Sequence, residues 1–169
     1  MVANRRIRHD ATACEGYFNS VQRAFTTHMS NIVDWFISHR SHDTTMRVLF
    51  VCVGNTCRSQ MAQAVARHLG HQAESAGTHP GEFIAANAIK VTSDIGIEMD
   101  GQSPKSVDDI DATGFDRIIS MGCGVECPAL PIDEDWGLDD PVGRGEEIYR
   151  ETLRDIMGRI DSLEEETDA

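Results

Sequence analysis

The sequence predicts an α/β domain built on a parallel β-sheet, and three observations support this fold class. From Met46 onward, strand-like apolar runs alternate with helix-like segments, which is typical of a parallel sheet covered on both faces. Residues 47–53 form a short, valine-rich run that leads into a glycine-containing turn, as expected of a buried parallel strand. The 169 residues suffice for one domain of ordinary size.

An N-terminal extension precedes this pattern. Residues 1–45 predict one amphipathic helix and a polar linker at 38–45, because apolar side chains recur every three or four positions, at Phe18, Val21, Phe25, Met29, Ile32 and Phe36. Two interpretations remain open. The segment is either a helix that packs on the domain or on a partner, or a wrongly assigned extension of a chain that starts at Met46.

The first half of the domain predicts two strand–helix units. After the strand at 47–53 and a turn at 54–56, residues 59–69 predict a helix with apolar residues on one side, ending before Gly70. Residues 72–76 predict a second strand that ends at Gly77. Residues 85–95 then predict a second helix, which Gly96 stops.

The second half predicts a further strand pair and a closing helix. Residues 104–110 predict a short helix and residues 115–121 a third strand around Ile118 and Ile119, while residues 129–132 are expected to lead into a fourth strand. Residues 146–163 predict an amphipathic helix, followed by a polar, acidic tail at 164–169. In a parallel sheet, the loops after the first and third strands emerge at the same carboxyl edge, where we expect the ligand.

The charge balance disfavours several classes of partner. The chain has 28 Asp and Glu residues against 15 Lys and Arg residues, a formal net charge of −13. Nucleic acids and anionic membrane surfaces are usually bound through basic surfaces, so neither is expected here. The apolar run at 48–53 is far shorter than the roughly 20 residues that span a bilayer.

The cysteines indicate redox, catalytic or metal chemistry rather than structural disulfides. There are five, an odd number, at positions 14, 52, 57, 123 and 127. The N-terminus has no apolar core of a secretory signal, so we expect a cytoplasmic protein. In such a reducing compartment, closely spaced cysteines are seldom structural crosslinks.

The most informative motif runs from Cys52, at the end of the predicted first strand, to Arg58 and Ser59, at the start of the next helix. A short glycine-containing loop can turn its backbone N–H groups toward one point, and the helix N-terminus adds its dipole there. Arg58 can hold two oxygens of an anion. The same field favours the thiolate of Cys52 as a nucleophile. We therefore expect a tetrahedral oxyanion to be bound by Val53, Gly54, Asn55, Thr56, Cys57, Arg58 and Ser59.

This motif resembles the anion-binding loop of low-molecular-weight protein tyrosine phosphatases and thioredoxin-coupled arsenate reductases. The resemblance extends over residues 46–163 and rests on residues 52–62 (CVGNTCRSQMA), 75–78 (SAGT), 101–105 (GQSPK), 121–128 (MGCGVECP) and 135–141 (DWGLDDP). It implies that residues 46–169 are a catalytic domain with an acidic tail. The implied fold is a three-layer α/β/α sandwich with a four-stranded parallel sheet.

Three local features favour the reductases within this superfamily. The phosphatases usually have proline where Gln60 stands. Cys123 and Cys127 follow the predicted third strand, and a phosphatase needs no such pair. After Asp140 and Pro141, the tyrosines that stack on an aryl phosphate in the phosphatases are missing.

The resemblance implies a mechanism for reducing arsenate to arsenite. Cys52 attacks arsenic and Asp140 acts as the general acid. Cys123 then attacks Cys52, Cys127 attacks Cys123, and thioredoxin or another thiol reduces the final disulfide. We expect no cofactor and no metal, because no further Cys or His clusters near the Cys123–Cys127 pair to complete a zinc site.

Alternatives to this interpretation stay open. A phosphatase would use Cys52, Arg58 and Asp140 alone, and a non-catalytic redox or arsenic-binding switch would use the cysteines as sensors. Cys123 and Cys127 could be inert thiols, and Asp140 could merely form a turn before proline. Cys57 either packs behind the loop or forms a protective bond with Cys52 under oxidation.

A potassium site found in some related reductases is not expected here. Acidic residues hold that ion at the positions that align with Gln63 and Lys105, and neither is acidic in this chain. We expect the ammonium of Lys105 to take the place of the ion and to steady Asn55 and Ser75.

Overall fold

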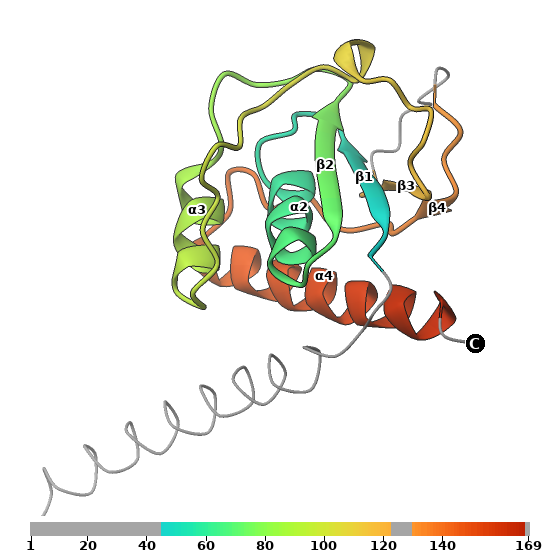
Figure 1. The fold of residues 1–169 in the computed structure, drawn as a ribbon. Helices are drawn as coiled ribbons and strands as arrows, with labels where there is room; N and C mark the ends of the chain where they lie inside the picture. The colour runs from blue at the N-terminus through green and yellow to red at the C-terminus, as the bar shows by residue number, and fades with distance from the viewer. Residues whose placement is uncertain (1–44, 123–129, 168–169) are drawn as a thin grey trace, which may run out of the picture. The chain divides into compact units, whose positions relative to one another are not determined.

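The computed structural model describes residues 45–122 and 130–167 of the chain. Its elements follow the order β1 (Arg47–Cys52), α2 (Arg58–His68), β2 (Gln72–Gly77), α3 (Ala86–Ser93), η1 (Val107–Asp109), β3 (Arg117–Ser120), β4 (Glu134–Asp135) and α4 (Glu146–Thr167). The four strands form one parallel sheet in the order β2-β1-β3-β4 (Figure 1). The predicted α/β fold with a four-stranded parallel sheet is confirmed.

The sheet is packed on both faces. Helix α2 lies against β1 and β2, and α3 and α4 pack beside α2 (Figure 1). On this side the Phe50 ring contacts Trp136, and Arg159 of α4 lies over the Trp136 ring. The opposite side holds a cluster of buried residues, against which η1 and the irregular segments around it pack: Leu49, Val51, Ala76 and Ile118.

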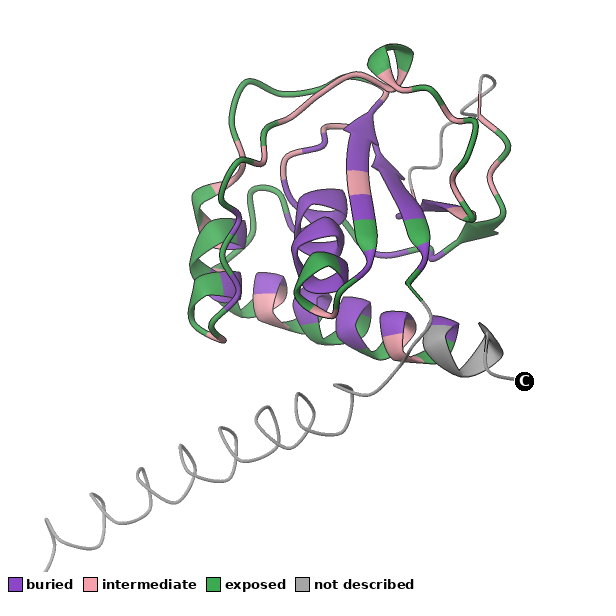
Figure 2. Cartoon of the chain, viewed as in Figure 1, coloured by how far each residue is buried: buried purple, intermediate pink, exposed green. Residues whose placement is uncertain are grey.

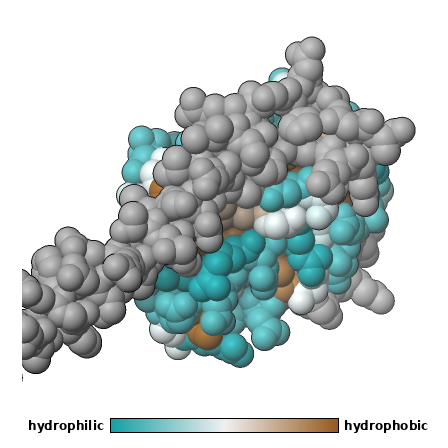
Figure 3. Space-filling view, turned by 90° about the horizontal axis from the view of Figure 1, so that it is seen from below, coloured by the Kyte–Doolittle hydropathy of each residue, from teal (hydrophilic) through white to brown (hydrophobic). Residues whose placement is uncertain are grey.

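Burial follows the pattern that the sequence predicted. Strand β1 is almost entirely buried, as expected of a central parallel strand. Helix α4 alternates buried and exposed positions, and α2 is largely buried (Figure 2). The face drawn in Figure 3 is mainly hydrophilic where its residues are described. No helix in the described ranges is long and apolar enough to cross a membrane.

The fourth strand begins after the residues that were expected to lead into it. Residues 129–132 were expected to feed a fourth strand, and β4 is the two-residue strand Glu134–Asp135. Leu130 and Ile132 instead pack their side chains against the buried cluster. Pro131 has no backbone N–H to donate to a ladder, and regular pairing with β3 starts only after it.

Two other elements differ in extent from their predictions. The short helix expected at 104–110 is reduced to the single 3₁₀ turn η1, which the Ser106 side chain caps by accepting a bond from the Asp108 N–H at 3.2 Å. Helix α4 continues to Thr167, into the tail that was expected to be irregular. Glutamate is a good helix former, which fits this continuation. The predicted N-terminal helix lies outside the described residues.

Candidate active site: an oxyanion loop between β1 and α2

The loop between Cys52 and Arg58 is held open by the segment that follows β2. The carbonyl oxygens of Cys52, Val53, Gly54 and Thr56 accept hydrogen bonds of 2.8–3.2 Å from N–H groups of residues 78–85. Because a peptide unit is planar, its N–H points opposite to its carbonyl. The N–H groups of Val53, Gly54, Asn55 and Cys57 therefore point to the other side, into the loop. The loop has the shape of the cradle that the sequence predicts, and its binding of an oxyanion stays a prediction.

Glycine and a left-handed residue allow this geometry. Asn55 has φ +48°, the only positive value outside glycine in the described parts of the chain. A Cβ on Gly77 would lie 2.6 Å from the Val53 carbonyl and 2.9 Å from the Asn55 Cβ, so only glycine lets β2 approach the loop. No side chain among the described residues caps the N-terminus of α2, which leaves its N–H groups available to an anion.

Cys52 lies at the centre of this loop. Its side chain is buried, and its sulfur accepts a hydrogen bond from the Asn55 N–H at 3.1 Å. The Ser59 Oγ lies 2.9 Å from the sulfur. Since that oxygen already accepts a bond from the Asn55 side-chain amide at 2.8 Å, its own hydrogen is free to point at the sulfur. Both contacts direct a hydrogen at the Cys52 sulfur.

The Asn55 side chain is the centre of a buried polar network. Its amide nitrogen donates to Ser59 and to Ser75, each at 2.8 Å. Its oxygen accepts from the Gln60 side chain at 3.1 Å and from the Lys105 backbone N–H at 2.9 Å. A fully satisfied network of this kind holds one conformation. It fixes the strained backbone of Asn55.

The prediction that the Lys105 ammonium steadies Asn55 and Ser75 is wrong. The ammonium instead forms a 2.6 Å ion pair with Glu74, and only the backbone N–H of Lys105 reaches Asn55. Ser75 donates to the Gln63 side-chain oxygen at 2.6 Å. The long lysine side chain extends past the network to a nearby carboxylate. Within the described ranges, no group of three or more His, Cys, Asp or Glu residues is placed to hold a metal ion.

Arg58 joins the oxyanion loop to two other segments. Its guanidinium is buried, and Nη1 donates to the carbonyls of Leu138 at 2.8 Å, Met121 at 3.3 Å and Gly122 at 3.4 Å. Nη2 forms a 2.9 Å ion pair with Asp140. The third nitrogen, Nε, is buried and has no hydrogen-bond partner among the described residues. A buried donor without a partner is costly, and the edge formed by Nε and Nη2 is the one that can grip two oxygens of an anion.

Asp140 combines two contacts that the sequence had presented as alternatives. One carboxylate oxygen pairs with Arg58, and the other accepts the Val142 N–H at 3.0 Å, across Pro141. The side chain is about half exposed, at 51%. Asp140 therefore both forms the turn before proline and faces the oxyanion site.

The buried Cys57 side chain directs its sulfur at Asp140. The thiol is buried and donates a long hydrogen bond of 3.7 Å to the Asp140 carboxylate. Burial, followed by the negative charge of Asp140, raises the pKa of the Cys57 thiol to about 11. A raised pKa favours the neutral form of a thiol, so Cys57 is protonated at neutral pH.

Cys57 is accordingly expected to resist alkylation at pH 7–9 and to react increasingly as the pH approaches about 11. Iodoacetamide labelling with peptide mass spectrometry across this pH range measures the midpoint. In Asp140→Asn the midpoint should fall, because one cause of the raised pKa is removed. Labelling of Cys57 at pH 8 at the rate of a free cysteine would contradict this assignment.

Cys123 and Cys127 lie outside the described residues, so the predicted relay pair is not placed. The structure does describe the residues immediately before them, up to Gly122. Strand β3 ends at Ser120, and the next two carbonyls, of Met121 and Gly122, face the Arg58 guanidinium.

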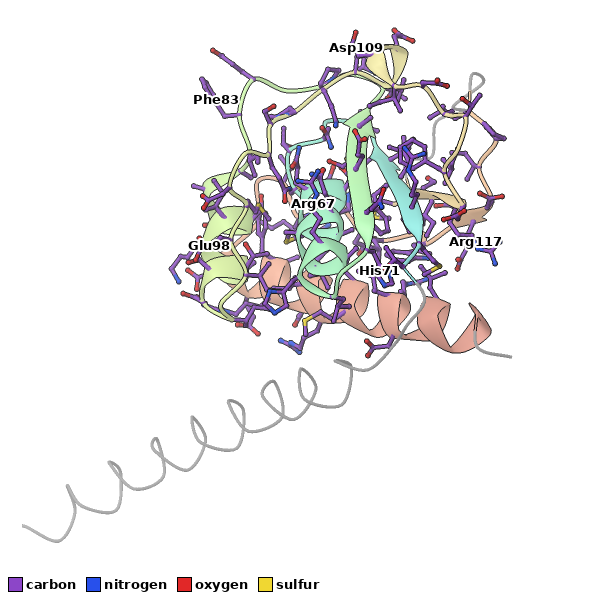
Figure 4. The ribbon with its side chains drawn as sticks, in the orientation of Figure 1. Arg67, His71, Phe83, Glu98, Asp109 and Arg117 are labelled. Atoms are coloured by element: carbon purple, nitrogen blue, oxygen red, sulfur yellow. The ribbon has the colours of Figure 1, made fainter. Side chains whose placement is uncertain are left out.

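Sequence reasoning missed three neighbours of the site. The Gln102 side-chain amide donates to the Gln60 side-chain oxygen at 2.7 Å, which extends the Asn55 network. Burial raises the pKa of the Tyr149 phenol, and the neighbouring Cys57 and Asp140 add to this shift. Phe83, on the segment that holds the loop, points away from the domain and is 72% exposed (Figure 4). The helical pattern marked Tyr149 as core, but no local signal linked it to Asp140.

Comparisons with known proteins agree with this geometry. Residues 47–169 match the family model described as low molecular weight phosphotyrosine protein phosphatase. A glutaredoxin arsenate reductase from Synechocystis is 35% identical over 130 residues, covering 69% of this chain and 95% of that protein. A putative arsenate reductase from Halobacterium salinarum is 35% identical over 136 residues, covering 75% and 96%.

Solved structures of an arsenate reductase and of a phosphatase are similar to this chain as well. An arsenate reductase in the phosphate-binding state superposes with a TM-score of 0.67 at 33% identity, covering 72% of this chain and 98% of that one. A low molecular weight protein tyrosine phosphatase from T. tengcongensis gives 0.58 at 30% identity, covering 72% and 99%. With its cysteine, oxyanion loop and arginine at the carboxyl edge of this sheet, the chain belongs to the low molecular weight phosphotyrosine protein phosphatase family.

Proposed function

We propose that this protein is an arsenate reductase, which converts arsenate to arsenite through Cys52, Cys123 and Cys127. The observation that carries the proposal is that the Cys52 sulfur lies beside an inward-facing backbone loop and the buried Nε of Arg58, which has no hydrogen-bond partner in the part of the chain that the structure describes. This arrangement fits a small tetrahedral oxyanion. The similarity to arsenate reductases supports arsenate as that oxyanion.

Binding of arsenate displaces Asp140 from Arg58. The oxyanion takes the Nε and Nη2 edge of the guanidinium, and the Nη1 contacts to the three carbonyls remain. Asp140 loses its cationic partner and gains an anionic neighbour. The released carboxyl group then protonates the hydroxide that leaves arsenic as Cys52 attacks.

The redox step moves two electrons from thiols to arsenic. The Cys123 thiolate attacks the Cys52 sulfur, the sulfur–arsenic bond breaks with its electron pair on arsenic, and arsenite leaves. Cys127 then attacks Cys123 and releases the Cys52 thiolate, which leaves a Cys123–Cys127 disulfide. An external dithiol reduces this disulfide. We infer thioredoxin or another thiol as the reductant, and the similarity to a glutaredoxin arsenate reductase makes glutathione with glutaredoxin a second source to test.

A phosphatase is the second candidate function. Phosphate and arsenate have the same tetrahedral shape, and the oxyanion loop would accept either. The similarity to a tyrosine phosphatase at 30% identity supports this alternative. It requires Cys52, Arg58 and Asp140 but not Cys123 or Cys127.

Replacing Cys123 with serine separates the two functions. We expect the wild type to form arsenite continuously with NADPH and either the thioredoxin system or glutathione with glutaredoxin. Cys123→Ser should lose this turnover, because no Cys123 thiolate is then available to attack the Cys52 sulfur and break its bond to arsenic. Hydrolysis of para-nitrophenyl phosphate by both proteins, with no arsenite from either, would instead identify a phosphatase.

A further inference from the structure

Gly122 contacts the segment before Asp140 more closely than any other residue type allows. Its φ is +85°, in the region that favours glycine. A Cβ at this position would lie 2.6 Å from the Leu138 nitrogen and 2.7 Å from the Gly137 Cα and carbonyl carbon. All three are backbone atoms, which cannot rotate away as a side chain could. A side chain here would have to push the two segments apart.

The segment that Gly122 contacts, residues 136–138, is hydrogen-bonded to the residues at the end of β3. The Trp136 N–H donates to the Ser120 carbonyl at 2.8 Å, and the Leu138 N–H donates to the Met121 carbonyl at 3.1 Å. The Gly122 N–H in turn donates to the Ser120 Oγ at 3.4 Å. The position of residues 136–138 therefore follows from the position of the turn after β3.

Asp140 follows this segment by two residues. The Leu138 carbonyl accepts the shortest of the three Nη1 bonds from Arg58, at 2.8 Å, and the Asp140 carboxylate pairs with Nη2 of the same guanidinium. A displacement of Leu138 would therefore move Asp140 relative to both Arg58 and the oxyanion loop. Misplacement of a reacting group by about 1 Å can slow a reaction by roughly 10²-fold.

We propose that Gly122 is a positioning residue for the general acid. By permitting backbone contact with Gly137 and Leu138, it sets the place of Asp140 beside Arg58 and the oxyanion loop. The inference rests on the proposed function, because it takes Asp140 to be the acid of the reaction. It goes further in naming a residue that acts on the chemical step without touching the substrate.

The test is a double-mutant cycle on arsenate reduction with Gly122→Ala, Asp140→Asn and the two combined. Asp140→Asn should lower kcat by roughly 10²-fold or more, the scale of general acid catalysis. Gly122→Ala should cost about 10²-fold, and the double variant should be no slower than Asp140→Asn alone. Gly96→Ala is the matched control, because Gly96 also has a positive φ, +82°, but a Cβ there meets nothing within 4 Å. It should keep close to the wild-type rate.

Each outcome of the cycle decides a different point. If the two losses multiply, or if Gly122→Ala keeps the wild-type kcat, the positioning role is wrong. If Asp140→Asn itself keeps full activity, the acid assignment in the proposed function fails first. Should Gly122→Ala not fold in thermal unfolding tests, Ser120→Ala serves instead, since it removes the Gly122 anchor and keeps the glycine. A loss of kcat that disappears in the Asp140→Asn background is then expected, and a loss that persists there would overturn the proposal.

Discussion

Cys52→Ser is expected to reduce arsenite formation by roughly 10⁴-fold or more, the scale on which loss of a nucleophile acts in covalent catalysis. The Cys52 sulfur accepts the Asn55 N–H and lies against Ser59, at the focus of the loop. A serine hydroxyl in its place is a weaker nucleophile and cannot form the disulfide that the proposed relay needs. Arsenite formation at saturating arsenate, with either thiol system, measures the loss.

The loop itself should survive this substitution. Inorganic phosphate is therefore expected to bind Cys52→Ser with an affinity close to that of the wild type, which calorimetry can measure. Cys14→Ser is the control for general effects of removing a thiol, because the proposed relay does not use Cys14. Retention of a substantial fraction of arsenite formation by Cys52→Ser would refute Cys52 as the nucleophile.

Arg58→Lys is the second substitution with a large expected effect. Lysine keeps the positive charge but lacks the two parallel N–H donors with which a guanidinium binds two oxygens of one anion. It also cannot bond the Leu138 and Met121 carbonyls and Asp140 in the geometry that Arg58 uses. Loss of this oxyanion contact should lower kcat/KM by about 10²–10³-fold, and the affinity for phosphate should fall with it.

A matched control for Arg58→Lys lies on the same helix. Arg67 donates through Nε to the Ala73 carbonyl at 2.8 Å, near the opposite end of α2 from the oxyanion loop. Arg67→Lys removes a comparable arginine–carbonyl contact away from the site, so it should keep near wild-type kcat/KM. Equal rates for the two lysine variants would show that the guanidinium of Arg58 does not act on the oxyanion.

The sequence was most informative where local pattern and tertiary role coincide. The valine-rich run of β1 and the apolar face of α4 predicted their elements, because burial of those residues is what forms them. The strand β4 has two exposed residues and therefore no apolar signal. Its position depends on Pro131 and on the side chains that flank it, which pack on the other segments of the protein.

The same distinction between local pattern and tertiary contact applies to the site. The oxyanion loop is contiguous in sequence, so its residue types and spacing sufficed to predict an inward-facing loop around Cys52, while its binding of an oxyanion stays a prediction. The ion pair between Arg58 and Asp140, the burial of Cys57 beside that carboxylate and the contact of Gly122 with Leu138 join residues far apart in the chain. Such contacts depend on how the loops after β1, β3 and β4 meet, and no local pattern records them. The error at Lys105 arose in the same way, because Glu74 attracts its ammonium from a neighbouring strand.

The three-cysteine relay is tested most directly by a single turnover without any external reductant. Fully reduced protein is mixed with excess arsenate, arsenite is counted per protein, and the disulfides are mapped by peptide mass spectrometry after acid quench. We predict one arsenite per protein and a disulfide between Cys123 and Cys127, with Cys52 again a free thiol. Absence of arsenite, or arsenite accompanied only by a disulfide between Cys52 and Cys57, would contradict the relay.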